Sequence, residues 1–458
     1  MANNDSDNFE QSKVTGRITR YAKVSTAVGT LAARLAGEKY LGIDINRDKH
    51  ATQLKDALGH LKGPLLKVAQ LLATIPQALP PEYTQELQQL QANAPAMGWP
   101  FVKRRMTAEL GRDWQDKFDN FERTASAAAS LGQVHKAILH DGNTVACKLQ
   151  YPDMNTIVEA DLKQLKLVFN IFKKYNNTVS PEDIYTEIAE RLYEELDYTL
   201  EAKHQKLYHY MLRDEEHVHV PRIIDDLSTE RLLTSEWHDG EKILDYKDAP
   251  QETRNTLALN LFRAWYTSLY NYGIIHGDPH PGNYTVREDL SINLLDYGCV
   301  RVFPPRLIHG VIMLYNALQN NDDDMAAEAY RHWGFTDLTN ELVDTLNIWA
   351  RFLYGPILED KERTIGDVGE HVYGKDVAEK VHEKLGNIGG LKVPREFVFM
   401  DRAALGMGSI FLHLQAKVNW FRVFNDLITD FSLEALTKTQ EDVLRRFDLP
   451  LTNTESST

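Results

Sequence analysis

The segment HGDPHPGN contains an aspartate and an asparagine at a spacing that suits phosphoryl transfer. Asp278 and Asn283 have the offset of a kinase catalytic loop, in which the aspartate orients the accepting hydroxyl or water and the amide oxygen binds Mg²⁺. Asp296 follows thirteen residues after Asn283, behind the apolar run INLL and before Tyr297 and Gly298. A carboxylate at the end of a buried strand can bind a metal ion that bridges nucleotide phosphates. The spacing predicts Asp278 as a catalytic residue and Asn283 and Asp296 as metal ligands.

Two other interpretations of this segment stay open. DPHPGN, taken alone, is also typical of a turn stiffened by two prolines. The alternation of His276, Asp278 and His280 would place three side chains on one side of an extended segment, as in a metal site. The metal-site interpretation accounts neither for Asp296 nor for a lysine in an earlier β-rich segment.

That lysine, Lys148, lies near the end of the second strand of a predicted hairpin, SLGQVHKAILHDGNTVACKLQ, whose turn contains Asp141 and Gly142. Kinases place a catalytic lysine on such a strand, where it binds phosphate oxygens and pairs with a helical glutamate. The preceding segment TASAAASLGQV has the place of a phosphate-covering loop but carries alanines instead of glycines, and the added methyl groups restrict its backbone. We therefore predict a nucleotide-binding set: Ala127, Ala128, Ala129, Ser130 and Lys148.

The glutamate that pairs with Lys148 is expected in the acidic segment EELDYTLEA, as Glu195 or Glu201. Acids at this density repel one another on a helix unless cations approach them. A solvated, charged helix face is the alternative explanation.

The elements around these residues change from helix to strand and back to helix. We predict a disordered leader at 1–12, a helical extension at 13–112, a β-rich lobe at 113–238, an α-rich lobe at 239–450 and a disordered tail at 451–458. Helices are expected from about Asn155 to Tyr175 and, without interruption, from Pro181 to Leu207 or beyond. The pattern indicates an α+β fold of two lobes.

Composition excludes several classes of protein. The 458 residues carry a formal charge of -15, which repels nucleic acid. Two distant cysteines, Cys147 and Cys299, disfavour a disulfide framework. The polar N-terminus lacks the features of a secretory signal, and no run of eighteen apolar residues occurs. We expect a cytoplasmic protein without a membrane span, and peripheral contact with the inner face of the membrane stays open.

Taken together, the motifs resemble those of the UbiB/AarF atypical kinases, a family that includes mitochondrial proteins needed for ubiquinone biosynthesis. The similarity extends from about Leu54 to Phe424. It rests on a K-x-G-Q helix motif, seen here as KVAQ at Lys67 to Gln70, and on the segments AAASLGQVHKA, VACKLQYP, ELDYTLEA, HGDPHPGN and LLDYG.

The resemblance implies a protein-kinase-like fold whose N-terminal helical extension lies over the active site. It implies an ion pair of Lys148 with Glu201, a hinge at Glu236 and Trp237 beside the adenine, and ATP or ADP with Mg²⁺ as cofactors. It also implies that Glu195 and Asp197 face Lys67 and Gln70 of the extension. The chain departs from the family pattern in Ala69 for the motif glycine and in Tyr297 for phenylalanine. Unlike family members that end in a transmembrane hairpin, this chain is expected to end in a soluble tail.

The segment after Asp296 argues against a general protein kinase, because residues 298–314 contain no serine, threonine or tyrosine. We expect a Mg²⁺-dependent ATPase or kinase that acts on a lipophilic small molecule, such as a quinone precursor, in isoprenoid-quinone metabolism. A nucleotide-sensing scaffold of a biosynthetic complex and an aminoglycoside-type phosphotransferase are the alternatives. Expected partners are ATP, the lipophilic molecule and a membrane surface or biosynthetic complex, but no nucleic acid. Homodimer formation stays open.

Overall fold

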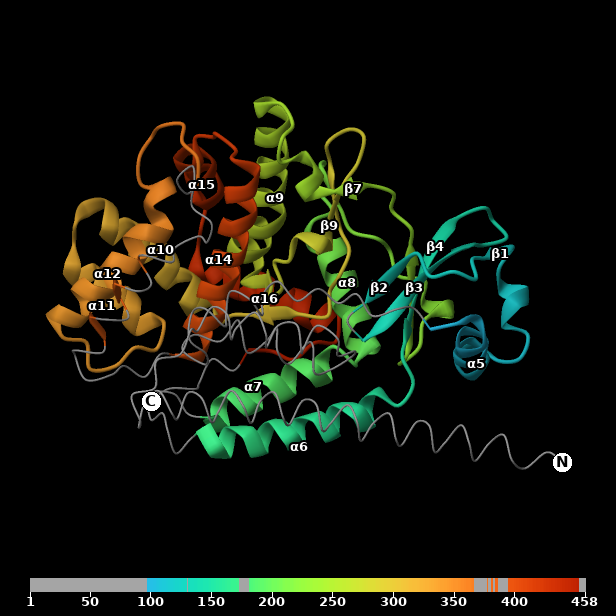
Figure 1. Ribbon diagram of the computed structural model, residues 1–458. Helices are drawn as coiled ribbons and strands as arrows, with labels where there is room; N and C mark the ends of the chain where they lie inside the picture. Colours follow the sequence, from blue (N-terminus) through green and yellow to red (C-terminus); the bar gives the residue numbers. More distant parts are fainter. Residues whose placement is uncertain are drawn as a thin grey trace, which may run out of the picture. The chain divides into compact units, whose positions relative to one another are not determined.

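A computed structural model describes residues 97–129, 131–172, 181–365 and 394–452, together with 377, 380–381 and 384–385 (Figure 1). The chain forms two compact units. The first extends to Asp197 and includes Thr229–Leu232, and the second comprises Tyr198–Ser228 and the chain from Leu233 onward. Most of the predicted helical extension, including Lys67 and Gln70, lies outside the described residues, as does the predicted leader.

The first unit is built on an antiparallel hairpin, as the sequence predicts. Strand β3 (Gly132–Ile138) pairs with β4 (Thr144–Gln150), and β1 (Asn120–Phe121) and β2 (Ala127–Ala129) both pair with β3. Asp141 Oδ1 accepts a hydrogen bond from the backbone N–H of Asn143 at 2.9 Å, and Gly142 has a φ of 84°. The predicted Asp141-Gly142 turn is therefore confirmed. Helix α5 (Trp99–Leu110) and the 3₁₀ turn η1 (Trp114–Lys117) precede this sheet.

Two helices, α6 (Met154–Phe172) and α7 (Pro181–Glu194), complete the first unit. The sequence predicted one uninterrupted helix from Pro181 to Leu207, and this prediction was wrong. The chain leaves the helix after Glu194, and α8 (Tyr198–Met211) starts anew. The buried side chain of Gln150 donates a hydrogen bond to Leu196 O at 2.9 Å, and Leu196 is itself buried. That tertiary contact holds the break, which the local periodicity does not encode.

The second unit contains most of the helices. After α8, its elements in chain order are β5 (Val218–His219), η2 (Asp225–Leu227), β6 (Leu232–Glu236), β7 (Glu241–Lys242), η3 (Ile243–Tyr246), α9 (Gln251–Tyr272), β8 (Ile274–His276), η4 (Pro281–Asn283), β9 (Tyr284–Val286), β10 (Ile292–Leu294), β11 (Val300–Val302), α10 (Pro305–Asn320), α11 (Asp323–His332), α12 (Asn340–Tyr354), η5 (Gly355–Ile357), α14 (Arg395–Leu414), α15 (Trp420–Ile428) and α16 (Leu433–Arg446). None of the helices in the described part of the chain is both long and apolar enough to cross a bilayer.

Short strands of the second unit position the predicted site. The order β5-β10-β9-β7 forms one small sheet, and β8 pairs with β11 in a separate ribbon. In that ribbon His276 lies opposite Val300, so the start of the predicted catalytic loop lies beside the chain that follows Asp296. Helix α9 supports both sheets, because Leu257, Leu261 and Trp265 are buried in the core of the unit.

Helix α16 holds the end of α9 through one glutamine. The side chain of Gln440 is 1% exposed, and its Nε2 donates to Tyr272 O at 2.8 Å and to Phe303 O at 2.9 Å. Its Oε1 accepts a hydrogen bond from Thr452 Oγ1 at 3.0 Å. Buried carbonyl groups that lose such a donor are costly.

We expect Gln440→Leu to lower the free energy of unfolding by about 1–3 kcal/mol, because two buried carbonyls lose their donor. Urea unfolding of the purified variant measures the effect. Gln115→Leu, at an exposed position, serves as the matched control. Equal stability of the two variants would contradict this account of α16.

Helix α14 carries a carboxyl group that is sensitive to pH. Burial raises the pKa of Asp401 to about 7, although the hydrogen bond from Trp349 Nε1 acts in the opposite direction. In the unfolded chain the pKa of this carboxyl group is about 3.9. Below about pH 3.9 the Asp401 carboxyl group is protonated in both the folded and the unfolded state, and its contribution to the free energy of unfolding is then largest. This contribution is lost as the pH rises through the pKa of the folded state, because the carboxyl group of the unfolded chain releases its proton first.

We therefore expect wild-type stability to fall between about pH 4 and pH 7 by an amount that Asp401→Asn removes, since the amide stays uncharged. Urea midpoints at pH 5 and pH 8 measure this difference for both proteins. Asp344→Asn, at an exposed position on α12, should keep the wild-type difference. An unchanged pH dependence in Asp401→Asn would show that another group is responsible.

Candidate nucleotide and metal site

The predicted catalytic loop folds back on itself through hydrogen bonds of its own. Asp278 O accepts bonds from Asn283 Nδ2 at 2.9 Å and from the backbone N–H of His280 at 2.8 Å. The backbone N–H of Asn283 donates to His280 O at 3.0 Å. The two prolines and η4 make this compact turn, so the stiff-turn interpretation and the catalytic interpretation describe the same geometry. The loop brings Asp278 and Asn283 together as the spacing predicts.

His276 joins this loop to the segment that carries Asp296. It is 2% exposed, its Nε2 donates to Asp296 O, and its Nδ1 accepts a hydrogen bond from the backbone N–H of Asp278 at 3.3 Å. The proton is therefore assigned to Nε2 from the bonding pattern. The imidazole is packed among aromatic rings of Tyr208, Trp265, Tyr284 and Tyr297.

A second link between the two segments is made by backbone alone. The N–H of Gly277 donates to Cys299 O at 2.6 Å. A Cβ atom at position 277 would lie 2.8 Å from Cys299 Sγ and 3.2 Å from Cys299 O, so the close approach requires glycine. Sequence reasoning did not assign a role to Gly277 or Cys299, and it weighed His276 only as a metal ligand. The glycine between His276 and Asp278 is the signal that could have indicated this contact.

Asp296 and Asn283 are held beside each other by neighbouring backbone. The N–H of Leu295 donates to Asn283 O at 3.0 Å, and Asp296 Oδ1 accepts from the N–H of Gly298 at 3.0 Å. Burial raises the pKa of Tyr284, and the negative charges of Asp278 and Asp296 raise it further. Both predicted acids therefore contribute to the raised pKa of the same buried phenol.

Tyr297 occupies the position where the family pattern has phenylalanine. Its ring is fully buried, and its hydroxyl donates to Leu294 O at 2.9 Å. The backbone oxygen of Tyr297 is 3.3 Å from Nδ1 of His204 on α8. Because the added hydroxyl finds a partner, the substitution leaves no buried polar group unsatisfied.

The residues present fit a hard divalent cation such as Mg²⁺. Asn283 uses its amide nitrogen to hold Asp278 O, which leaves Oδ1 as the atom it can offer to a ligand. Asp296 adds a carboxylate whose Oδ1 is oriented by Gly298 N–H. Carboxylate and amide oxygens are the ligands that Mg²⁺ takes in proteins. These two residues would hold the ion, which would neutralise phosphate charge.

The alternative metal site of His276, Asp278 and His280 is not supported. Both ring nitrogens of His276 are engaged by backbone groups, and Nδ1 of His280 accepts from the N–H of Gly282 at 3.0 Å. Among the residues that the structure describes, no group of three or more histidine, cysteine, aspartate or glutamate side chains could hold a metal ion.

The predicted nucleotide-binding residues of the first unit lie on the hairpin and its edge strand. Ala127, Ala128 and Ala129 form β2, which pairs with β3 from Ala127 opposite Val134 to Ala129 opposite Gly132. Lys148 lies on β4, half-buried and also opposite Val134. Ser130 lies outside the described residues. The alanine segment is therefore a strand and not a helix.

The predicted acids divide between the two units. Glu201, on α8 in the second unit, is 2% exposed, whereas Glu195 and Asp197 follow α7 in the first unit. A buried carboxylate requires a compensating partner. Because Lys148 belongs to the first unit, its ion pair with Glu201 stays a prediction. The contacts of Glu195 and Asp197 with the extension stay predictions as well.

The predicted hinge has ordered polar side chains. Glu236 Oε2 accepts from the backbone N–H of Arg222 at 3.0 Å and lies 3.6 Å from His238 Nε2. Trp237 Nε1 donates to Asp239 Oδ1 at 2.7 Å. The role of Glu236 and Trp237 beside the adenine stays a prediction.

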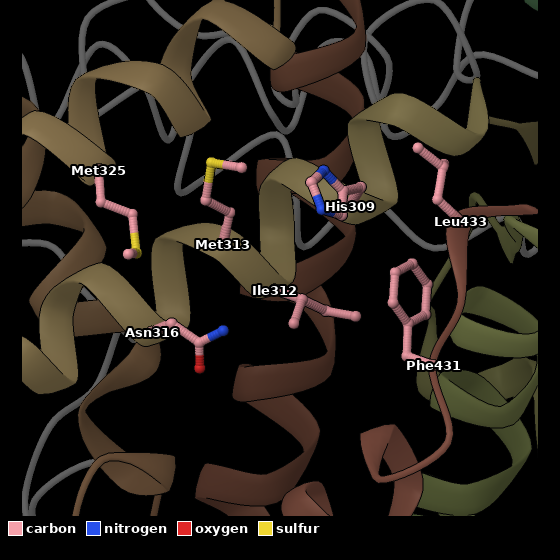
Figure 2. A pocket seen from close by; sticks show the side chains of 7 residues that line it. All are labelled: His309, Ile312, Met313, Asn316, Met325, Phe431 and Leu433. Carbon is pink, nitrogen blue, oxygen red and sulfur yellow. The ribbon is translucent and has the colours of Figure 1, made fainter.

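The second unit also contains a pocket with a volume of about 360 Å³. Figure 2 shows the side chains that line it. It lies between α10, α11 and the segment that leads into α16. None of the predicted catalytic, nucleotide-binding or metal-binding residues lines it, so it is not a candidate for the nucleotide site. Its seven lining residues are His309, Ile312, Met313, Asn316, Met325, Phe431 and Leu433.

The folded elements and the loop chemistry define a class of protein. One unit carries an antiparallel hairpin with a lysine, and the other is α-rich and joins an aspartate, an asparagine and a strand-end aspartate. This is the α+β, protein-kinase-like fold that the sequence predicts.

Comparison with known proteins gives the family. Residues 89–330 match the family model for the ABC1 atypical kinase-like domain, which is more than half of the chain. The chain belongs to this family, the UbiB/AarF group of atypical kinases, as its motifs predict.

Two relatives and one solved structure illustrate the similarity. Protein ACTIVITY OF BC1 COMPLEX KINASE 7, chloroplastic, of Arabidopsis thaliana is 36% identical over 55% of this chain and 37% of its own. AarF domain-containing protein kinase 1 of Mus musculus is 31% identical over 60% of this chain and 54% of its own. The matched segments thus span about half or less of these relatives. The solved complex of Rv3197 with erythromycin, from Mycobacterium tuberculosis, has a TM-score of 0.58 and 26% identity, covering 83% of this chain and 96% of that one.

We expect His276→Leu to loosen the catalytic loop, because one side chain makes both the bond to Asp296 O and the bond from Asp278 N–H. Loss of two buried hydrogen bonds should lower the free energy of unfolding by roughly 2–4 kcal/mol. Urea unfolding, with hydrogen exchange of residues 277–283, measures the change. His217→Leu, exposed on the same unit, is the control and should behave as wild type. Unaltered loop exchange in His276→Leu would contradict the bridging role.

Proposed function

We propose that this protein is a Mg²⁺-dependent, ATP-binding atypical kinase or ATPase of the UbiB type. One observation carries the proposal: the bonds from Asn283 Nδ2 to Asp278 O and from Leu295 N–H to Asn283 O bring a catalytic acid and two oxygen ligands together. Phosphoryl transfer depends largely on such positioning and on charge stabilisation.

Each residue has a distinct part in this chemistry. Asp278 accepts a hydrogen bond from the attacking hydroxyl or water and orients it toward the terminal phosphate. Asn283 and Asp296 would hold the divalent ion, which would supply positive charge to the phosphate oxygens. Lys148 binds phosphate oxygens and pairs with Glu201 in the complete site. Ala127 to Ser130 cover the phosphates, and Glu236 and Trp237 border the adenine.

A small or lipid-like acceptor suits the segment after Asp296 better than a peptide does. Cys299 is joined to Gly277, β11 pairs with β8 at once, and α10 starts at Pro305. This short connection leaves no long activation segment on which a peptide could dock. Rv3197, with the same fold, is solved in complex with erythromycin, a small molecule. The family link to ubiquinone biosynthesis favours a quinone precursor.

The setting of this activity is part of the proposal. A lipophilic substrate requires peripheral contact with a membrane or with a biosynthetic complex, and the charge of -15 disfavours nucleic acid as a partner. The extension that contains Lys67 and Gln70 acts as a regulatory cover through Glu195 and Asp197. A homodimer is compatible with each of these features.

A nucleotide-sensing scaffold is a second candidate function. The observation in its favour is that the alanines of β2 lie in regular strand pairing with β3, where their methyl groups keep backbone from approaching phosphates as closely as glycine allows. Such a protein would bind nucleotide and turn over little of it.

We expect Asp296→Asn to lower ATP hydrolysis by about 100-fold or more, because the metal loses a charged ligand. The asparagine still accepts the Gly298 N–H bond, so the fold should persist. Steady-state phosphate release with Mg²⁺ is measured with and without liposomes that carry a phenolic quinone precursor. Asp248→Asn, at an exposed position, is the control.

The outcomes separate the two candidate functions. Turnover that increases with the precursor and disappears in Asp296→Asn supports a lipid-coupled enzyme. Tight nucleotide binding without turnover under every condition supports the scaffold. Absence of any nucleotide binding by the wild-type protein contradicts both.

A further inference from the structure

Helix α14 lies very close to the catalytic loop at Gly406. An ideal Cβ atom built on Gly406 would lie 2.2 Å from Cγ of Pro279 and 3.1 Å from its Cβ. Real Cβ atoms essentially never lie within 3.0 Å of a non-bonded heavy atom, so only glycine allows the two segments to lie this close. Pro279 is buried and stands directly after Asp278.

The rest of α14 is anchored, so the helix cannot easily move away. One face is buried in the core through Ala403, Met407, Ile410, Phe411 and Leu414. This face follows the spacing of a single helical stripe. The helix packs against α9, and Figure 1 shows the two side by side.

Both ends of α14 are also tied to other elements. At the C-terminal end, Nη1 of Arg254 donates to Leu414 O at 2.8 Å and to Gln415 O at 3.2 Å. At the N-terminal end, the ring of Phe397 packs against the rings of Trp333 and Phe335. The distances between ring centroids are 5.3 Å and 5.2 Å, respectively. Trp349 Nε1 donates to Asp401 in the first half of the helix.

The loop is a short turn, whose hydrogen bonds include those within it, those to His276 and Cys299, and the one from Leu295 N–H to Asn283 O. When a methyl group is added at position 406, the anchored helix stays and the loop yields. The displacement starts at Pro279 and passes to its neighbour Asp278. It then reaches Asn283, the predicted metal ligand, because Asn283 Nδ2 is hydrogen-bonded to Asp278 O.

We propose that Gly406 is a positioning residue for the catalytic loop, and that α14 acts as the rigid surface that sets where Asp278 lies. This inference rests on the proposed function for its effect on rate, but its structural part does not depend on any activity. Gly406 acts through Pro279 and touches no reacting group.

Gly406→Ala is a sharp test because helix propensity acts in the opposite direction. Alanine has a higher helix propensity than glycine, so the substitution by itself stabilises α14. We expect faster amide exchange in residues 277–283 and a kcat lower by roughly 10- to 100-fold, as misplacement of a catalytic group by about 1 Å produces. The nucleotide Kd should change by less than about threefold, because most nucleotide contacts lie elsewhere.

Gly355→Ala is the matched control. A Cβ atom at Gly355 meets nothing within 4 Å, and the residue has φ -44° and ψ -46°, which alanine adopts readily. Loop exchange, kcat and nucleotide Kd should all equal the wild-type values.

A double variant tests whether Pro279 transmits the effect. Pro279→Ala removes the Cγ atom that the new methyl group meets, so Gly406→Ala with Pro279→Ala should be less impaired than the product of the two single effects predicts. If the loss in the double variant equals the product of the two single losses, the contact between position 406 and Pro279 is not the cause of the effect.

The outcomes separate this inference from the proposed function. Wild-type loop exchange and wild-type kcat in Gly406→Ala would overturn the inference while leaving the enzyme intact. A parallel loss of kcat, nucleotide affinity and thermal stability would also overturn it, because that pattern indicates general damage. If the wild-type protein binds no nucleotide, the proposed function fails, and loop exchange still decides whether Gly406 positions Asp278.

Discussion

One imidazole joins the two segments on which the site depends. His276 binds Asp296 O through one ring nitrogen and Asp278 N–H through the other, within a shell of aromatic rings. Buried polar groups require partners, and here each partner belongs to the backbone of a predicted functional residue. A change in the position of one segment is therefore transmitted to the other. The loop and the strand-end aspartate behave as one structural element.

The surrounding fold supports that element from several sides. The ribbon of β8 and β11 aligns the two segments, and the close approach of Gly277 to Cys299 holds the ribbon together. Helix α9 supports β8 from the core, and Gln440 of α16 holds the carbonyl groups at the end of α9. Dense packing of this kind transmits strain, which is why a single methyl group at Gly406 is expected to affect chemistry at Asp278.

The arrangement also separates two requirements of phosphoryl transfer. The oxygen ligands Asn283 and Asp296 are oriented by bonds within a few residues of each other, so their geometry is local. The lysine and the alanine strand belong to a separate compact unit. The contacts that position the predicted acid and metal ligands therefore lie within the second unit.

The sequence by itself determined the hairpin with its Asp-Gly turn, the order of the motifs and the kinase-like class. These features depend on short-range spacing and on turn chemistry, which are written in consecutive residues. The break between α7 and α8, the bridging role of His276, the Gly277 contact and the Gly406 contact were decided by tertiary structure alone. Each depends on atoms that lie far apart in the chain, such as Gln150 with Leu196 and Gly406 with Pro279, and no local pattern records which distant surfaces will meet.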